Sequence, residues 1–477
     1  MYNSILQKLE ELAKKICERS YFGEITDLDL MAADVLADCK EVSTEIIEVI
    51  IETMNREFRE DKPFRKEQGL VIKEKDRPRE LLTALGTIHY ERDYYFDNRA
   101  EQYTIPVDQM LGVRRYERIG GSVCAELVAS AAEQSYAKAA NAVTGGRVSR
   151  QTVHDKILKV TVPEMEPAEE KKQVQELHVY ADEDHAHEQK AHKKKGKQGI
   201  IIPLVTVTDG TRKVSEGRNE TINAMHFSDE GFHSAGVWKS AEGYIAAAYD
   251  METLEKIYVH GDGGAWIMNG LDVFSQTRHI MDGYHFFKEL KKICRIFPDR
   301  NVKIALLNSL GKNDRKKADA FIQELLKELS DRSQEAKLTE KQCEKTEKFA
   351  GYLFRHWDPI RRLVIEDVPG SCTEAQIGHV LSERFSRDPM GWSRPVLGKL
   401  VGIRLYLKNG GSLTKAVFQE GELKTERYRD LADRFIAEHL RGAVDFSLFE
   451  AERPIFDGFS GTQIWIHGLS ATRNMLA

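Results

Sequence analysis

The most constraining feature of this sequence is a run of strand-like segments, within residues 176–300, that changes midway into alternating helices and strands. The first three segments are separated only by turns or short loops and are rich in β-branched or aromatic residues. In chain order the segments read LHVYADED, GIIIPLVTVTDG, TINAMHFS, VWKSAEGYIAAAYDMETLE, KIYVHGDG, AWIMNG, TRHIMDG and YHFFKELKKICRI. Their order, βββ-α-β-α-β-α, predicts an α/β domain with a mixed sheet of the RNase H-like type. By itself this analogy of fold specifies no function.

Two aspartates stand where apolar strands of this domain end. Asp182 follows the strand LHVYA, and Asp262 follows the strand KIYVHG. The first and fourth strands are neighbours in an RNase H-like sheet, so the two carboxylates should lie close together. Carboxylates suit Mg²⁺, which prefers hard oxygen ligands, and two such ions can catalyse phosphodiester cleavage. Each aspartate considered alone could equally initiate a turn.

Two further acids leave alternatives open. Asp184 lies two residues after Asp182 and would point to the same face if the strand continues, so it is a rival for the same ligand position. Glu374 lies in the first turn of a predicted helix, within the pattern Ser371-x-x-Glu374. This pattern is also a capping box, in which the glutamate bonds back to the helix-start amide. From the residues alone, Glu374 is either a third metal ligand or a helix cap.

The part of the chain before this domain is predicted to be mostly helical. Residues 1–60 alternate apolar and charged positions at helical spacing, and LGTIHYERDYYF predicts a small hairpin that turns at Gly86. Further on, SYAKAANAV, TGGR and VSRQTVHDKILKV predict a helix, a glycine-containing turn and a second helix capped by Ser149. This pattern is typical of a helix-turn-helix segment, although most helical hairpins bind no DNA.

The second helix of this pair has polar side chains near its start. These candidate DNA-binding residues are Arg150, Gln151 and His154, which could reach base edges or phosphates if the helix entered a major groove. A second set of candidates is the basic stretch between the first two strands, Lys193, Lys194, Lys195 and Lys197. These lysines could hold a phosphate backbone, and they could equally be solvated charges of a hairpin.

The predicted organisation has six parts. They are an N-terminal helical region with a hairpin (1–120), a helix-turn-helix-like segment (121–165), the RNase H-like core (176–300), a helical insertion (301–368), a helix that completes the core (369–400) and a C-terminal region (401–477).

Composition excludes several classes of protein. The net charge of −6 argues against a protein that coats nucleic acid by charge alone, although 70 basic residues leave room for local positive patches. No run approaches the roughly 20 apolar residues of a membrane helix, and the amino terminus lacks the apolar block of a signal peptide. Six cysteines form no CxxC pair, so neither a zinc site nor a disulfide framework is expected. These features predict a cytoplasmic protein.

Three motifs together resemble a known family. YADEDHAHEQ, KIYVHGDGGAWI and SCTEAQIGHVLSERFSRDPMGWS are similar to segments of the ISLre-type insertion-sequence transposases, which are distantly similar to Mutator-type transposases. The resemblance extends from about residue 80 to about residue 400. It implies a DDE-type RNase H-like domain with a helical insertion, and an acidic triad at Asp182, Asp262 and Glu374. Asp282 and His285 in MDGYH look like an acidic-x-x-His motif of Mutator-like relatives, although Asp282 could simply cap the following helix.

The resemblance implies a DNA transposase that cleaves and joins the ends of an insertion sequence. Its triad would hold two Mg²⁺ or Mn²⁺ ions, and no covalent protein–DNA intermediate is expected. The implied partners are double-stranded DNA, as terminal repeats and target, and further copies of the chain in a homodimer or higher oligomer. The implied location is the prokaryotic cytoplasm, at the nucleoid. Two alternatives remain: a non-catalytic DNA-binding protein descended from a transposase, and an RNase H-like nuclease without strand transfer.

Overall fold

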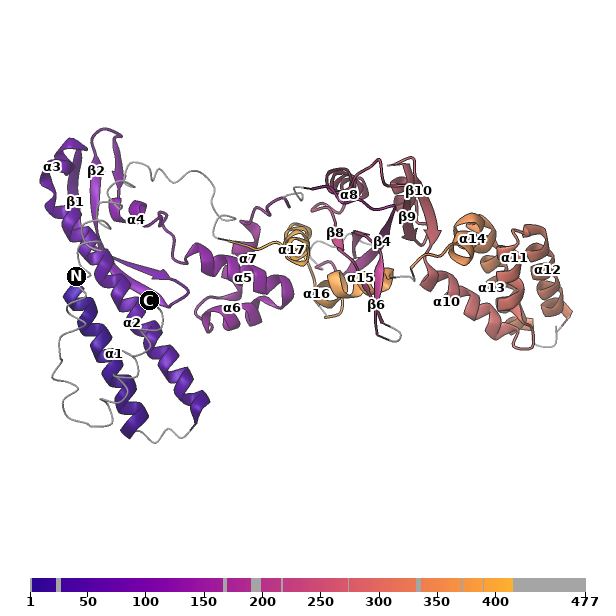
Figure 1. Cartoon of the computed structure of the whole chain (residues 1–477), viewed down its shortest axis with the longest axis horizontal. Coiled ribbons are helices and arrows are strands. Elements are labelled where there is room, and N and C mark those ends of the chain that lie inside the picture. The colour runs from indigo at the N-terminus through magenta and orange to yellow at the C-terminus, as the bar shows by residue number, and fades with distance from the viewer. Residues whose placement is uncertain are drawn as a thin grey trace, which may run out of the picture. The chain divides into compact units, whose positions relative to one another are not determined.

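The structure is a computed structural model of the chain, and it forms two compact units, Met1–Gly120 and the part that begins at Gly121 (Figure 1). The description covers residues 2–22, 27–165, 170–189, 199–215, 218–272, 274–331, 336–369, 372–388 and 390–414. The four candidate lysines at 193–197 therefore lie outside the described residues, as does most of the predicted region 401–477.

The first unit combines helices with a three-stranded antiparallel sheet. Its elements are α1 (Tyr2–Phe22), α2 (Leu28–Glu60), α3 (Lys62–Glu67), β1 (Leu70–Leu82), β2 (Thr87–Asp97), β3 (Gln102–Thr104) and α4 (Pro106–Met110). The predicted helical start and the hairpin are confirmed, and backbone hydrogen bonds between Thr83 and Gly86 close the turn of the hairpin. Arg59 of α2 donates to the buried carboxylate of Asp93 on β2 at 2.7 Å, which fixes the long helix on the sheet.

The second unit begins with three helices, α5 (Gly121–Glu133), α6 (Tyr136–Thr144) and α7 (Arg150–Leu158). The predicted pair of helices with a glycine-containing turn is confirmed. Gly145 ends α6 in the left-handed conformation, with φ 60°, which glycine adopts without strain. The hydroxyl of Ser149 accepts the Thr152 amide at 3.1 Å and caps α7, as predicted.

A five-stranded mixed sheet forms the centre of this unit. Its order is β10 (Thr277–Met281), β9 (Lys256–Gly261), β4 (Glu176–Ala186), β5 (Ile200–Thr208) and β8 (Met225–Phe227). The strands β4, β9 and β10 run parallel, whereas β5 and β8 are antiparallel to their neighbours. The predicted adjacency of the first and fourth strands is confirmed, because β4 pairs with β9.

The third strand is shorter than the sequence predicts. Only Met225–Phe227 joins the sheet, and the preceding residues form a separate hairpin of β6 (Thr211–Ser215) and β7 (Arg218–Thr221). Asn223 has φ 51°, a left-handed backbone conformation that cannot continue a strand. This residue explains why TINAMHFS is not one continuous strand.

The alternation of β4 separates its two faces. Leu177, Val179 and Ala181 pack in an apolar cluster with helix α8 (Ser234–Ala248), which covers one face of the sheet. Because successive side chains point to opposite faces, His178, Tyr180 and Asp182 belong to the other face. The polar face of the central strand therefore carries the candidate acid.

A helical bundle follows the last strand. Its elements are α10 (Gly283–Ile296), α11 (Val302–Gly311), α12 (Arg315–Asp331), α13 (Ala336–Arg355) and α14 (Trp357–Ile365). Two short helices, α9 (Ala265–Met268) and η1 (Asn269–Asp272), lie earlier in the chain, between β9 and β10. The predicted helical character of residues 301–368 is confirmed. The core of the bundle starts earlier than predicted, because Phe286 and Leu290 of α10 pack with Leu325 and Trp357. None of the described helices has the length and apolar character needed to cross a membrane.

One further helical run packs against both the sheet and the first helices of this unit. It consists of α15 (Thr373–Ile377), the π-helical turn η2 (Gly378–Ser382) and α16 (Glu383–Phe385), and α17 (Arg394–Lys408) follows it. Helix α17 crosses the predicted boundary at residue 400. Buried Arg404 of α17 donates to the carbonyls of Val380 and Ala132, and buried Arg384 donates to the carbonyl of Ala131 at 3.0 Å. These bonds attach α5 to the run that carries Glu374.

The stability of this unit should depend on pH through His226 on β8. Its ring lies against the Thr206 hydroxyl at 2.9 Å, and burial lowers its pKa to about 4. The unfolded chain takes up the proton near pH 6.5, so this contribution is complete above that pH and is lost as pH falls toward 4. Between pH 6 and pH 5, the free energy of unfolding of the wild type should fall by about 1 kcal/mol more than that of His226→Asn.

Urea unfolding of both proteins at a series of pH values measures this difference. At pH 7.5 the variant should have the lower free energy of unfolding, because the contacts of the ring are lost. The difference in free energy of unfolding between the two proteins should decrease as the pH is lowered. Parallel curves for the two proteins would show that His226 does not titrate in this way.

Candidate active site

Parallel pairing aligns the two candidate aspartates at one edge of the sheet. Tyr180 of β4 pairs with His260 of β9, and Asp182 and Asp262 each lie two residues further along their strands. Asp262 directly follows β9, and its Oδ1 accepts the Gly264 amide at 2.8 Å. The charge of Asp262 also raises the pKa of Asp182.

Glycine is required in the loop that carries Asp262. Gly263 has φ 85°, and a Cβ there would lie 2.7 Å from the His356 ring. Both the left-handed backbone and this close approach exclude a larger side chain without rearrangement. The sequence GDGG therefore fixes where Asp262 leaves the strand.

Asp182 lies in surroundings that disfavour its negative charge. Its pKa is raised to about 7, mainly by burial and also by the charges of Asp262 and Glu374. The Glu183 amide, which donates to its Oδ1 at 2.9 Å, and the nearby His285 act in the opposite direction. Such a pKa is expected of a buried carboxylate that lacks a sufficient counter-charge.

Asp282 and His285 form a coupled pair at the end of β10. Asp282 is fully buried, and one of its oxygens accepts both the backbone amide of His285 at 3.1 Å and the ring Nδ1 at 2.7 Å. Its other oxygen accepts the Thr373 hydroxyl at 3.2 Å. The predicted capping of α10 by Asp282 is thus confirmed, and the same carboxylate also orients the imidazole.

The position of His285 favours its charged form. Its hydrogen bond with Asp282 raises its pKa, and the charges of Asp282, Asp182 and Asp262 add to this effect against the opposing effect of burial. The carboxylates around the ring therefore favour its protonated form.

Glu374 reaches the same space from α15. Its Oε1 lies 3.8 Å from Nε2 of His285, and its side chain is half exposed. The N-cap of this helix is Cys372, so Glu374 is the second helical residue and does not hold the third position that the Ser371 capping box requires. The structure thus groups Asp182, Asp262, His285 and Glu374.

Asp184, the rival acid on β4, has a different environment. Its Oδ1 accepts the hydroxyls of Ser382 and Ser386, at 3.1 and 2.9 Å. Its Oδ2 is buried without a hydrogen-bond partner in the described part of the chain. These bonds hold the helical run that carries Glu374 on the central strand, so Asp184 contributes to the position of Glu374.

The acidic side chains are not arranged as a complete set of metal ligands. Within the described ranges, no group of three or more His, Cys, Asp or Glu side chains is arranged to hold a metal ion. The side chain of Glu374 is 50% exposed, and Asp262 is exposed as well.

A layer of neutral rings lies beside the aspartates, and sequence reasoning missed it. The rings of His178 and His260 are joined by a hydrogen bond of 3.0 Å, and Tyr180 stacks on His260 with ring centroids 4.5 Å apart. Burial lowers the pKa of His260 to about 3, so it is uncharged at neutral pH. The two-residue strand period places His178 and Tyr180 on the face of Asp182 and could have revealed this layer.

The candidate DNA-binding residues of α7 differ in their exposure to solvent. Arg150 and Gln151 are exposed, as expected near a helix start, and His154 is half-buried. The amide of Gln151 donates to Asp155 at 2.8 Å, which satisfies part of its polar side chain. Arg150 and His154 line a pocket together with residues of the helical run near Arg384.

Residues 24–422 match the model of a family described as "Uncharacterised protein family (UPF0236)". The chain belongs to the UPF0236 family. The match includes every residue of the acidic group, from Asp182 to Glu374.

Three relatives show how far the family similarity extends. A UPF0236 protein of Caldanaerobacter subterraneus subsp. tengcongensis is 32% identical over 86% of this chain and 84% of its own length. A second from the same organism, whose name joins eleven locus designations, is 33% identical over 82% of this chain and 81% of its own. A third, from Streptococcus gallolyticus, is described as "UPF0236 protein in vanSb 3'region" and is 22% identical over 80% of this chain and 83% of its own.

The charge of His285 should depend on Asp282. We expect Asp282→Asn to lower the pKa of His285, because the amide can still cap α10 but no longer carries the negative charge that stabilises the imidazolium. Titration of the histidine ring signals by NMR, in metal-free protein, measures this change. His285→Asn identifies the signal, and an unchanged His285 pKa in Asp282→Asn would contradict the coupling.

Proposed function

We propose that this UPF0236 protein is a DDE-type DNA transposase, in which Asp182, Asp262 and Glu374 hold the metal ions for DNA cleavage and strand transfer. The observation that carries the proposal is the parallel register of β4 and β9, which sets Asp182 and Asp262 at one sheet edge. A helix from beyond the helical bundle adds Glu374, whose Oε1 is 3.8 Å from His285.

The topology supports this assignment. The first strand of the sheet is central, its antiparallel partner lies on one side and the fourth strand lies parallel on the other. This is the strand order expected of an RNase H-like domain, and the bundle between β10 and α15 corresponds to the insertion expected from the resemblance. The likeness is one of fold, so the function depends on the acids.

The donor set fits divalent metal ions. The pKa of Asp182 is raised first by burial and also by the charges of Asp262 and Glu374, and Glu374 lies 3.8 Å from His285. These side chains are not already arranged around an ion within the described residues, so binding would draw them together. Mg²⁺ and Mn²⁺ favour oxygen ligands of this kind. Bound there, two ions would activate the attacking oxygen and stabilise the leaving oxygen of the phosphodiester.

The residues around the triad have separate tasks. Asp282 holds the His285 ring through Nδ1, which leaves Nε2 directed toward Glu374. A proton on Nε2 can be donated to a phosphate oxygen of the DNA that enters this space. Asp184 and its two serine partners keep the helical run of Glu374 on β4.

The relatives add an independent argument. One relative's name joins eleven locus designations within one organism. Several copies of one gene in a genome are what a mobile element that carries the gene would leave behind. We therefore infer that the partners of this chain are double-stranded DNA and other copies of the chain, since both element ends must be held together.

To test this proposal, purified protein is incubated with Mg²⁺ or Mn²⁺ and with labelled DNA that carries the ends of the insertion sequence encoding the protein. The wild type should give both nicked and joined products. Asp182→Asn, Asp262→Asn and Glu374→Gln should each lower product formation by roughly 10³-fold or more, with little change in folding or DNA binding. Glu383→Gln, an exposed acid of the same helical run, is the matched control and should stay active.

The products separate the alternatives. Metal-dependent nicking without joining would favour a nuclease, and DNA binding without either product would favour a non-catalytic DNA-binding protein. A fully active Glu374→Gln protein would remove Glu374 from the metal site.

A further inference from the structure

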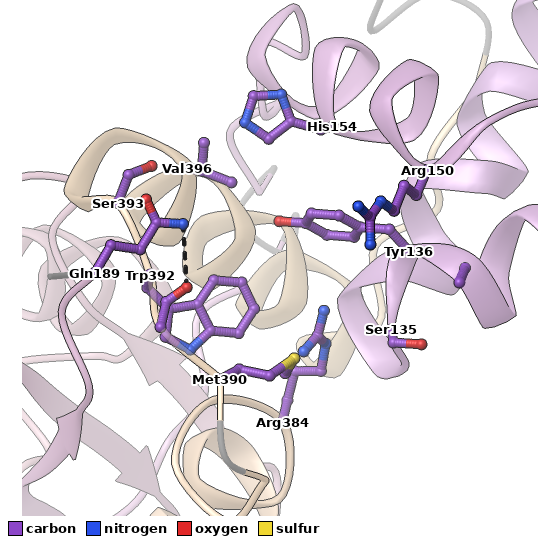
Figure 2. Close-up of a pocket in the computed structure, with 12 residues that line it drawn as sticks. Ser135, Tyr136, Arg150, His154, Gln189, Arg384, Met390, Trp392, Ser393 and Val396 are labelled. Carbon is purple, nitrogen blue, oxygen red and sulfur yellow. Dashed lines mark hydrogen bonds between the residues drawn. The ribbon is translucent and has the colours of Figure 1, made fainter. Parts of the chain in front are cut away.

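A pocket of about 290 Å³ lies between the first turns of α6 and α7 and the segment that leads into α17 (Figure 2). Tyr136 and Arg150 reach it from the two helices, and Arg384 and Trp392 reach it from the other side. We refer to it as the α6–α7 pocket. It is separate from the acidic group, none of whose members lines it.

The α6–α7 pocket is built for a negative charge. Its described lining contains Arg150, His154 and Arg384 and no carboxylate, although Nδ1 of His154 lies 3.1 Å from the Asp155 carboxylate. Arg384 is only 3% exposed and donates its Nε to the carbonyl of Ala131. The charges of Asp388 and Glu133 act on it, but burial has the larger effect and lowers its pKa, and no carboxylate of the described residues forms an ion pair with it. Figure 2 shows the rest of its guanidinium directed into the pocket. A buried cation without an acidic partner is costly unless an anion accompanies it.

Aromatic groups form the remaining walls. The Tyr136 hydroxyl points into the pocket, and the ring of Tyr136 lies edge-on to that of His154, with centroids 6.3 Å apart. Trp392 lies under the Arg384 guanidinium at 4.9 Å. Cations beside aromatic rings suit a phosphate joined to a flat base. The volume is near the lower limit of about 300 Å³ for ligand pockets, which suits one nucleotide but not a duplex.

The pocket has a fixed spacing from the acids. Arg384 follows Glu374 by ten residues in one helical run. At the α-helical rise of 1.5 Å per residue their backbones would be at most about 15 Å apart, since the π-helical turn η2 lies between them. Asp184 holds that run on β4 through Ser382 and Ser386, so the spacing is rigid. At about 3.4 Å per nucleotide, this distance equals four or five nucleotides of a strand.

We propose that the α6–α7 pocket binds one unpaired nucleotide of the DNA strand, four or five positions from the phosphodiester held at the acidic group. The inference rests on the proposed function, since it assigns the ligand of the pocket from the DNA that a transposase holds. In this arrangement Arg150 and Arg384 contact the phosphate, and Tyr136 and His154 contact the base.

The experiment compares binding of a blunt duplex with binding of the same duplex carrying a short oligo-dT tail, in EDTA so that no cleavage occurs. The wild-type chain should prefer the tailed DNA by about tenfold, as expected for one stacked and charge-paired nucleotide. Ala137→Leu fills the pocket from an exposed lining position, and Arg150→Ala removes one cation. Both should reduce the preference to near unity. Ala137→Leu should do so without weakening blunt-duplex binding, whereas Arg150 is also a candidate duplex contact, so its effect is measured only as the ratio of tailed to blunt binding.

Two matched controls lie outside the lining. Ala142→Leu makes the same change at an exposed position of α6, and Arg147→Ala removes an exposed arginine from the turn before α7. Both should keep the preference for the tail. Absence of a preference in the wild type, or its persistence in Ala137→Leu, would overturn the pocket assignment. Because these measurements use no metal, loss of the tail preference and loss of cleavage are distinguishable failures.

Discussion

The pairing of β4 with β9 is the interaction on which the rest of the structure depends. Its parallel register determines that Asp182 and Asp262 leave their strands at the same level. The apolar face of the same central strand packs under α8. A slip of one residue would exchange the faces and send the acid into the apolar cluster. The apolar core and the acidic group thus depend on one register.

The other face of the sheet combines buried charge with buried neutral rings. Asp282 is compensated by His285 and Thr373, whereas Asp182 is compensated only in part and its pKa rises accordingly. The rings of His178 and His260 fill neighbouring space without adding charge. This arrangement concentrates uncompensated negative charge at the sheet edge, which disfavours the folded state by itself and favours it when a cation binds.

Sequence reasoning succeeded where the signal is local. Strand periodicity located β4, β5, β9 and β10, and the strand order then brought Asp182 beside Asp262. It failed on the third strand, where the left-handed Asn223 breaks a segment with good strand propensity. It also left Glu374 undecided between ligand and cap, because that choice depends on where α15 begins and on what faces it.

Long-range packing was beyond the reach of such reasoning. Arg384 and Ala131 are far apart in the chain, yet a buried hydrogen bond joins them, and Arg384 lines the α6–α7 pocket. No periodicity or motif marks Arg384 as a buried cation, since charged residues on helices are usually solvated. The anchoring of Asp184 by Ser382 and Ser386 is hidden for the same reason.

The central claim is that the sheet edge between β4 and β9 holds divalent metal ions. The most direct measurement is anomalous diffraction from crystals of the full chain grown with Mn²⁺ and a DNA end. The account predicts manganese peaks against the carboxylates of Asp182 and Asp262, and loss of those peaks in Asp262→Asn. A map with manganese elsewhere, and none at these two aspartates, would contradict it.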